Sequence, residues 1–572
     1  MFITGYAPYG ADGVIIRVET DIRRGIPGID ITGLAEGAVR EARERVRAAF
    51  RNSGLEFPLD RVLINLAPAG LRKDGAALDL PIAVSVMAAA GLVPGLALFP
   101  EQLMVLGELE LSGRVRPVRG TLAAAAAGLR EGVRFFIVPK ENGEEAAILL
   151  GGNRTEYSGQ DGTEYSEAVR KYAAPVPTFA AVSSLEETVH ALVLLGSGGT
   201  FPPLMDTERR NKTQVRSGYN NGSYNGGDLS GFADFAEVRG QERYKRALEI
   251  AAAGGHNLLV FGPPGSGKTM LARRLPSIMP ALSPEEAVEV TRLHSLAGFP
   301  VRTEDHPSLI TRPPFRSPHH SASAEGILGG GRTIRPGEIT LAHLGILFLD
   351  EAPEFKANVL QALREPLEDQ VITIARAEGP VKLPAGFQLV LAANACPCGK
   401  LGSRNHETWD NAGEGQGDWN GGGCLCGAEE IYRYWRKFGG ALLDRIELRA
   451  AVPPPDFSGP AAERQSSRSI ALRVEKAVAI QRRRFALSPC RRNARMQASQ
   501  LDKFCTLTEA ADQAFRKAAE RLALSGRGCH GILKTARTIA DLEGEEIIGA
   551  DHILEAVDFR RQGDDPYDIL SG

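Results

Sequence analysis

The chain has 572 residues and a formal net charge of −3 at pH 7, so it is long enough for about three to four domains and too balanced in charge to attract nucleic acid as a whole. No apolar run reaches the ~20 residues needed to span a bilayer, and the N-terminus lacks the basic and apolar segments of a secretory signal. Together with seven cysteines, four of them in two Cys-x-Cys pairs, this predicts a cytoplasmic protein without a membrane partner.

The order of apolar and polar runs predicts a multidomain α/β protein. Residues 1–190 alternate short strand-like runs with helical stretches, which is an α/β pattern. Residues 196–231 are rich in Gly, Asn and Ser, bury little apolar surface and are expected to form a flexible linker. Residues 232–455 again alternate strands and helices, whereas the helical pattern of residues 456–572 predicts a small lid.

The most informative motif is a phosphate loop, Gly262-Pro263-Pro264-Gly265-Ser266-Gly267-Lys268-Thr269. It follows the apolar run Asn257–Phe261, which is expected to be a buried strand, and precedes a helical run at Met270–Leu275. Small residues allow successive backbone N–H groups of such a loop to converge on phosphate oxygens. Lys268 adds a cation for the β- and γ-phosphates, and the Thr269 hydroxyl is placed to bind Mg²⁺. The motif therefore predicts a site for ATP and Mg²⁺.

Two acidic residues end a second apolar run, Gly345–Leu349. Asp350 at the end of this strand can hold Mg²⁺ directly or through water, and Glu351 can orient and deprotonate the attacking water. A third apolar run, Phe387–Ala393, ends at Asn394, whose amide can position that water beside the γ-phosphate. These residues predict hydrolysis of ATP rather than binding alone.

Several separate motifs resemble those of the YifB/ComM family of Mg-chelatase-like AAA+ ATPases, over nearly the whole chain. In chain order these are Asp234–Glu242, the phosphate loop, Phe315–Ser321, Gly329–Arg332, Arg335–His343 and Leu442–Ile446. The resemblance implies a Lon-protease-like N-terminal α/β domain, an AAA+ P-loop α/β core and a C-terminal helical lid. It also implies a homo-hexameric ring. For the ComM members it implies a helicase on branched or single-stranded DNA that promotes branch migration in natural transformation, with a recombinase as a candidate partner.

Two arginines take their roles from this resemblance. Arg445 resembles the arginine finger, whose planar guanidinium would stabilise charge on the γ-phosphate held by the neighbouring subunit. An ion pair with Asp444 or Glu447 is the other role open to it. Arg527, ahead of a helix expected at Ile532–Leu542, resembles the sensor arginine of the lid.

The N-terminal unit is similar to the proteolytic domain of Lon. The matching stretches are Arg72–Ala77 and Gly107–Val118. Lon proteases use a Ser–Lys dyad, in which the amine takes the hydroxyl proton and the serine attacks. Here the expected serine position is Ala77 and the expected lysine falls near Leu122, while Ser85 and Lys73 lie nearby in sequence but occupy neither of the two dyad positions. We therefore expect a scaffold that is not proteolytic.

Basic residues in two regions are candidates for contact with DNA. In a ring motor, loops that face the pore must make and release backbone contacts, and Arg332, Arg376 and Lys382 lie in two such insertions, the latter two in a hairpin expected at Ile372–Leu383. The stretch 464–495 holds nine Arg and a single acid, with three arginines together at a helix end: Arg482, Arg483 and Arg484. Such a cluster can bind phosphates, but it can also offset its own helix dipole or pair with acids elsewhere.

Four cysteines, Cys396, Cys398, Cys424 and Cys426, form two short pairs on either side of a Gly- and Asn-rich loop. Four thiolates can close a tetrahedral Zn²⁺ site, which would stabilise a loop that has no core of its own. His406 could replace one ligand. Reduced thiols that pack as small apolar groups are the alternative.

The leading hypothesis is an ATP-driven DNA translocase that acts on branched recombination intermediates. The alternative is a chelatase-like ATPase that remodels a protein partner. An ATP-dependent protease is disfavoured by Ala77 and Leu122.

Overall fold

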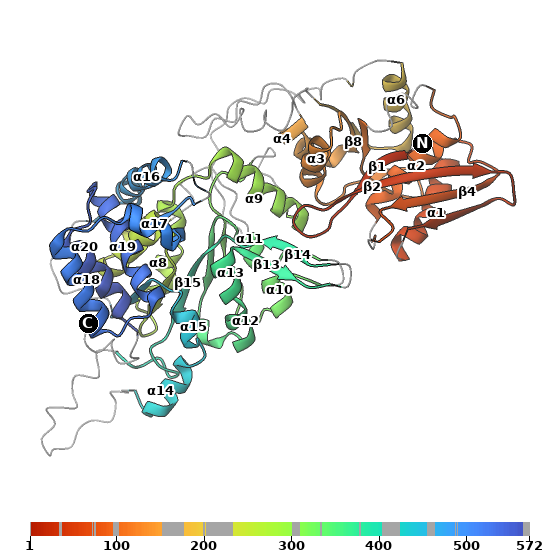
Figure 1. Cartoon of the computed structure of the whole chain (residues 1–572). Helices are drawn as coiled ribbons and strands as arrows, with labels where there is room; N and C mark the ends of the chain where they lie inside the picture. Colours follow the sequence, from red (N-terminus) through yellow and green to blue (C-terminus); the bar gives the residue numbers. More distant parts are fainter. Residues whose placement is uncertain are drawn as a thin grey trace, which may run out of the picture.

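The computed structural model describes residues 2–33, 37–70, 73, 76–94, 102–150, 177–197, 201, 233–299, 309–331, 334–376, 379–402, 424–454, 464–486, 488 and 490–563. In these ranges the chain forms an N-terminal body, a central body and a C-terminal helical body, which follow one another from one end of the molecule to the other (Figure 1). The linker predicted at 196–231 lies outside the described residues except for 196, 197 and 201.

The N-terminal body is built on a seven-stranded mixed sheet in the order β3-β4-β2-β1-β5-β8-β9. Its strands are β1 (Phe2–Ala7), β2 (Val14–Arg23), β3 (Gly28–Thr32), β4 (Arg61–Ala67), β5 (Leu103–Val105), β8 (Phe135–Pro139) and β9 (Thr178–Val182), and a small hairpin joins β6 (Glu108–Leu109) to β7 (Val115–Arg116). Its helices are α1 (Gly37–Asn52), α2 (Asp79–Ala89), α3 (Thr121–Arg130), α4 (Gly143–Leu150) and α6 (Leu185–Gly196).

Helix α1 shows how the sequence pattern produces the packing of this body. Its buried residues recur at helical spacing: Val39, Ala42, Val46, Ala49 and Phe50. They form one apolar face against the sheet, whereas α2 is buried from Asp79 to Met87. The buried Asp79 carboxylate at the start of α2 is paired with Arg45 of α1 at 2.7 Å, so a charge inside the core has its partner.

The central body is a five-stranded sheet in the order β11-β12-β15-β10-β16, and its neighbouring strands are parallel. The strands are β10 (Leu258–Phe261), β11 (Phe315–Arg316), β12 (Ile346–Leu349), β15 (Gln388–Ala393) and β16 (Leu448–Ala451). A separate antiparallel hairpin consists of β13 (Val371–Ile374) and β14 (Val381–Pro384). The helices are α7 (Glu242–Gly254), α8 (Lys268–Ala272), α9 (Pro284–Ala297), α10 (Ala324–Leu328), α11 (Glu338–Leu341), α12 (Ala357–Ala362), α13 (Arg364–Asp369), α14 (Ala428–Trp435) and α15 (Gly440–Leu443). Because the strands are parallel, the carboxyl ends of β10, β12 and β15 meet at one edge of the sheet.

The C-terminal body consists of helices. They are α16 (Ser467–Arg484), α17 (Ala498–Phe504), α18 (Glu509–Arg521), α19 (Gly526–Glu543) and α20 (Ala550–Arg561). Helix α19 starts six residues earlier than the helix predicted at Ile532, because Ser525 caps it by accepting the N–H of Gly528. Arg527 therefore lies in the first turn of α19 rather than in a preceding loop.

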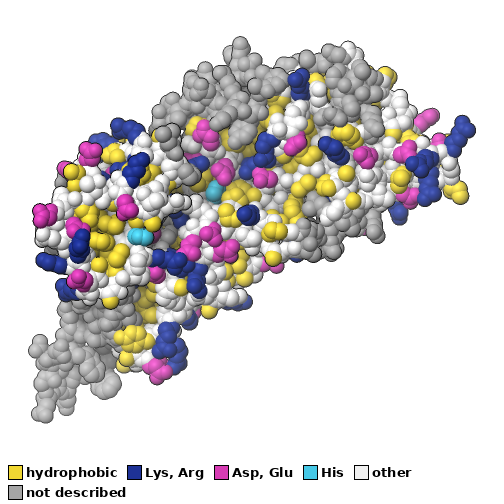
Figure 2. Space-filling view, viewed as in Figure 1, with side chains coloured by type: hydrophobic (Ala, Val, Ile, Leu, Met, Phe, Trp, Pro, Cys, Tyr) yellow, Lys and Arg dark blue, Asp and Glu magenta, His cyan; other side chains and the backbone are white. Residues whose placement is uncertain are grey.

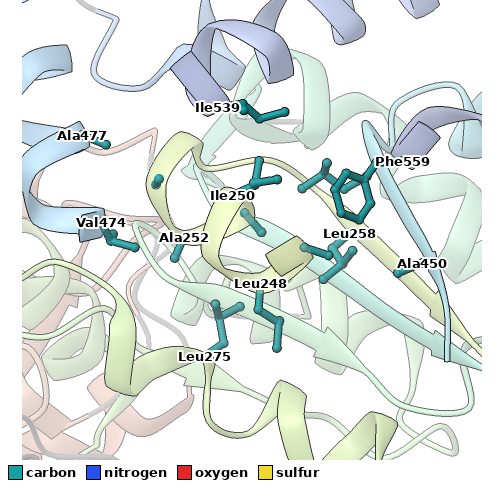
Figure 3. Packing of buried hydrophobic residues seen from close by; sticks show 14 of the residues in the cluster. Leu248, Ile250, Ala252, Leu258, Leu275, Ala450, Val474, Ala477, Ile539 and Phe559 are labelled. Atoms are coloured by element: carbon teal, nitrogen blue, oxygen red, sulfur yellow. The ribbon is translucent and has the colours of Figure 1, made fainter. Parts of the chain in front are cut away.

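Helix α7 joins this helical body to the central sheet. Leu248, Ile250 and Ala252 of α7 lie among the side chains of both (Figure 3). The other labelled members are Leu258, Leu275 and Ala450 of the central body and Val474, Ala477, Ile539 and Phe559 of the helical body. One apolar cluster therefore spans the two bodies, and the helices have a fixed position on the sheet.

Helix α9 makes the equivalent connection to the N-terminal body. Apolar side chains of α9 share a buried cluster with the alanines of α3, and Arg292 of α9 pairs with Asp12 at 2.5 Å. In Figure 1 this helix lies between the two bodies. The N-terminal body is thus packed directly against the body that carries the phosphate loop.

Candidate active site

The phosphate loop lies between the buried strand β10 and helix α8, as the motif predicts. Its backbone favours glycine for two different reasons. Gly267 has a φ of +92°, a left-handed conformation that glycine adopts without steric cost. At Gly262 an added Cβ would lie 2.2 Å from the carbonyl oxygen of Val452, so this chain segment passes too close for any side chain. The loop is further held by Gln241, whose amide donates to the carbonyls of Ser266 (3.3 Å) and Pro453 (2.7 Å).

Lys268 is the first residue of α8, and its buried side chain is bonded back to the loop. Its ammonium donates to the carbonyl oxygens of Gly262 and Pro263, both at 2.8 Å, and to Oδ1 of Asn394 at 3.3 Å. Burial lowers the pKa of Lys268 to about 8, against the opposing effect of Asp350 and Glu351. The cation that the motif offers to phosphate is therefore only weakly stabilised by its protein surroundings.

Thr269, Asp350 and Glu351 lie together at the same edge of the sheet. The Thr269 hydroxyl donates to Oδ2 of Asp350 at 2.8 Å, which brings a hydroxyl and a carboxylate oxygen together, the ligand types that Mg²⁺ prefers. Glu351 has a φ of +49°, a strained conformation for a residue with a side chain. This turn leaves its carboxylate exposed, with one oxygen 3.6 Å from Nδ1 of His320.

Arg445 lies at the opposite edge of this sheet. Its carbonyl oxygen accepts from the side chain of Asn257 at 2.9 Å, and Asn257 precedes β10, whereas the phosphate loop follows β10. Four residues of extended strand separate the two positions by about 13 Å. The backbone of Arg445 therefore lies about one strand length from the phosphate loop of its own chain.

The guanidinium groups of Arg445 and Arg527 meet on one carboxylate. Arg445 contacts Oε1 of Glu368 at 2.7 Å, and Arg527 contacts the same oxygen. Neither Asp444 nor Glu447, the partners considered from sequence, has this role. Asp444 is bound to Arg560 at 2.8 Å, and Glu447 accepts the backbone N–H of Asn257 at 3.0 Å.

The candidate DNA contacts differ in their surroundings. Basic and acidic side chains are interspersed over the face seen in Figure 2, so a DNA contact depends on particular residues. On the hairpin, Lys382 is exposed on β14, and Arg376 is exposed beside the turn and bonded to the carbonyl of Gly331. Arg332 lies outside the described residues.

The three arginines at the end of α16 do not form one unit. Arg482 and Arg483 are exposed and donate to backbone carbonyls, of Ala281 at 3.2 Å and of Ala479 at 3.5 Å. Arg484 is held by the fully buried Asp541 of α19, with its Nη1 2.7 Å from Oδ2. This is the alternative that sequence left open, an arginine paired with an acid elsewhere, and it separates Arg484 from the other two.

The four cysteines converge although residues 403–423 separate the two pairs in the sequence. Their sulfur atoms lie within 4.8 Å of one another, with Cys396 to Cys398 at 3.3 Å and Cys424 to both Cys396 and Cys398 at 3.6 Å. A tetrahedron of thiolates at a Zn–S distance of about 2.3 Å has edges of about 3.8 Å. The geometry fits a metal of this kind far better than a disulfide, whose sulfurs are about 2.05 Å apart. His406 lies outside the described residues.

In the N-terminal body the Lon-like dyad positions hold Ala77 and the fully buried Leu122. Ser85 and Lys73, the serine and lysine that lie nearby in sequence, are each bonded to a different group and not to each other. The Ser85 hydroxyl donates to the carbonyl of Val18 at 3.1 Å, and the Lys73 ammonium donates to the carbonyl of Leu66 at 3.0 Å.

Sequence reasoning missed three residues at these sites. Gln241 and His320 lie inside stretches that carry the family resemblance, but nothing in the sequence indicates that they contact the phosphate loop and Glu351. Glu368 lies outside those stretches, in an ordinary charged helical segment, Arg364–Asp369.

Three family profiles cover most of the chain. The profile for magnesium chelatase subunit ChlI matches residues 234–458, that for subunit ChlI of Mg-chelatase matches residues 18–142, and that for the C-terminal part of ChlI matches residues 464–560. The fold and the site thus define a Mg-chelatase-like AAA+ protein.

Full-length relatives narrow this class. The chain is 38% identical over 557 residues to protein YifB of Salmonella typhimurium and 35% identical over 557 residues to competence protein ComM of Haemophilus influenzae, covering 97% of this chain and 96% of each relative. It belongs to the YifB/ComM family. Over 146 residues it is also 31% identical to the Lon protease of Salinispora arenicola, covering 24% of this chain and 18% of that protein. These findings confirm the predicted multidomain α/β fold with a Lon-like N-terminal region, an AAA+ core and a helical C-terminal region.

The helices of the described residues include none that combines the length and the apolar character needed to cross a membrane.

Proposed function

We propose that this chain forms a homo-hexameric ring that hydrolyses ATP and moves along DNA, promoting branch migration in homologous recombination during natural transformation. The observation that supports it most is the division of the site between two edges of one sheet. Lys268, Thr269, Asp350 and Asn394 lie at one edge, and the backbone of Arg445 lies at the other, one strand length of about 13 Å away. A subunit arranged in this way needs a second copy to complete its site.

In this proposal the nucleotide is held by one subunit and activated by two. The backbone N–H groups of the loop and the Lys268 ammonium bind the phosphates. Thr269 and Asp350 hold Mg²⁺, which would neutralise charge on the β- and γ-phosphates. Glu351 takes a proton from the attacking water, and Asn394 orients that water. Arg445 of the next subunit stabilises the charge that develops on the transferred phosphoryl group.

The DNA-directed part rests on the relative named for competence and on basic residues at exposed positions. Arg376, Lys382, Arg482 and Arg483 are candidates to contact backbone phosphates, which needs no sequence preference. Arg484 is left out of this set because its guanidinium holds Asp541.

We also propose a structural Zn²⁺ in the four-cysteine cluster. The Cys396–Gly399 turn contacts the phosphate loop, since a Cβ on Gly399 would lie 3.1 Å from Cδ of Pro264. The metal would therefore stabilise a segment that begins two residues after Asn394 and rests on the loop. Metal analysis of the purified protein should give about one zinc per chain.

The test is a branch-migration assay on four-way DNA junctions with ATP, combined with measurement of the ATPase rate. Wild-type protein should migrate junctions and hydrolyse ATP faster with forked DNA. Glu351→Gln should bind nucleotide but lose about 100-fold or more in hydrolysis, because it lacks the base, and should not migrate junctions. The matched control is Glu354→Gln, the same change at an exposed residue of the following turn, which should keep both activities.

Two results would contradict the proposal. A wild-type rate that DNA leaves unchanged and a protein partner raises would favour the chelatase-like remodelling ATPase, which the magnesium chelatase profiles also support. A wild-type ATPase rate in Glu351→Gln would show that Glu351 is not the base that takes the proton from water.

A further inference from the structure

Glu368 binds both Arg445, which the proposed mechanism assigns to the transferred phosphate, and Arg527, which resembles the sensor arginine of the lid. Its Oε1 lies 2.7 Å from Arg445 and also contacts Arg527, although Arg445 follows α15 and Arg527 lies in α19, 82 positions later in the chain. Two guanidinium groups on one carboxylate leave an excess of one positive charge. The cluster is therefore electrostatically complementary to a further anion.

Arg445 has unused bonding capacity in this arrangement. Its side chain is only 10% exposed, and its buried Nε has no hydrogen-bond partner within the described part of the chain. A buried arginine with one unpaired N–H group is stabilised by an acceptor that offers more oxygen atoms than a single carboxylate. A terminal phosphate is such an acceptor.

The two arginines belong to one rigid unit. Asp444, next to Arg445, accepts from Ser525 at the N-cap of α19 (3.0 Å) and from Arg560 of α20 (2.8 Å). Arg560 also donates to the carbonyl of Ile446 at 2.8 Å. The segment that carries Arg445 is thereby fastened to the helix that carries Arg527, so both guanidiniums approach or leave Glu368 together.

Glu368 lies close to the base of the β13–β14 hairpin, so a movement of Glu368 can be passed on to that hairpin. It occupies the last turn of α13, and β13 begins three residues later at Val371. The carbonyl of Gln370, between them, accepts from Ala385 just beyond β14 at 2.7 Å. The end of α13 and the base of the β13–β14 hairpin are therefore bonded to each other.

We propose that Glu368 is a positioning residue that holds Arg445 and Arg527 as a pair and gives them up to the terminal phosphate of the nucleotide bound by a neighbouring copy of this chain. When the arginines turn to the phosphate, the end of α13 loses its two cationic partners and the hairpin beside it shifts. This inference rests on the proposed function, because it needs a nucleotide shared between subunits. It adds the residue that competes with the phosphate and connects it to the DNA-facing hairpin.

The test compares Glu368→Gln with Glu365→Gln, which makes the same change at an exposed position one turn earlier in α13. The amide keeps the size of the side chain but loses the negative charge, so it holds the cations less strongly and the arginines are released more readily to the phosphate. We expect the ATPase kcat of Glu368→Gln without DNA to rise about fivefold, as loss of a partly exposed pair allows, with an unchanged KM. Stimulation by forked DNA should fall to about 1.5-fold or less. Glu365→Gln should match the wild type in both.

The outcomes separate this inference from the proposed function. A Glu368→Gln ring with a basal kcat at or below the wild-type value overturns the role given to Glu368, whatever the response to DNA. If DNA does not stimulate the wild type, the DNA-directed function fails, and the basal rates still decide the role of Glu368. If Glu368→Gln does not assemble, the basal ATPase rate of Glu368→Asp tests the role of Glu368. Its shorter carboxylate holds the pair less closely, so its basal rate should rise above that of the wild type, and an unchanged rate contradicts the proposal.

Discussion

Raising the pH should weaken nucleotide binding, because the ammonium group of Lys268 loses its proton. In the free protein the buried ammonium has a pKa of about 8, and bound phosphates raise that pKa because they favour the charged form. Binding above pH 8 therefore takes up a proton. With a pKa of about 8, about nine tenths of Lys268 is protonated at pH 7 and about one tenth at pH 9. Affinity should fall about tenfold between these pH values, which corresponds to ~1.4 kcal/mol.

The assay is equilibrium binding of a non-hydrolysable ATP analogue at pH 7, 8 and 9 and constant ionic strength. The matched variant is Lys268→Arg, whose guanidinium stays protonated throughout this range. Where this variant binds the analogue, its affinity should be nearly independent of pH. Equal wild-type affinity at pH 7 and pH 9 would refute the reasoning, because it would mean that burial in the loop does not weaken the charge of Lys268.

Two further predictions concern the helical body and the cysteines. Arg484→Ala should destabilise α19 by about 2 kcal/mol, because the buried Asp541 loses one of its two arginine partners and keeps Arg537, as read by faster hydrogen exchange of α19. Arg483→Ala should change stability by less than about 0.5 kcal/mol and should instead lower the salt dependence of DNA binding. Equal hydrogen exchange of α19 in the two variants would contradict the structural role given to Arg484. Cys396→Ser should abolish zinc binding and lower the ATPase rate, whereas Cys529→Ser should retain both, and a Cys396→Ser protein with one zinc per chain would rule out this site.

The phosphate loop was predictable because its chemistry depends on neighbours in sequence. Gly262 and Gly267 meet backbone constraints that no other residue satisfies, and Lys268 and Thr269 follow at fixed positions. Asp350 and Asn394 were predictable for a related reason, since each ends an apolar run and the ends of parallel strands meet at one edge. Helix α19 shows where this approach fails. The sequence predicted this helix only from Ile532, whereas the Ser525 cap and the burial of Gly528 and Gly531 outweigh the low helix propensity of its early glycines.

The sequence by itself thus determined the class of fold and the positions of the predicted phosphate loop and of the acids beside it, because these follow from local spacing and strand ends. Only the tertiary structure decided which charges meet. It placed Arg445 away from its own loop, joined Arg445 and Arg527 on Glu368, and gave Arg484 to Asp541 rather than leaving it free for DNA. An ion pair depends on where two distant segments come to lie and on how much water they exclude. Neither the positions of two distant segments nor the water that they exclude can be inferred from the residues next to one position in the sequence.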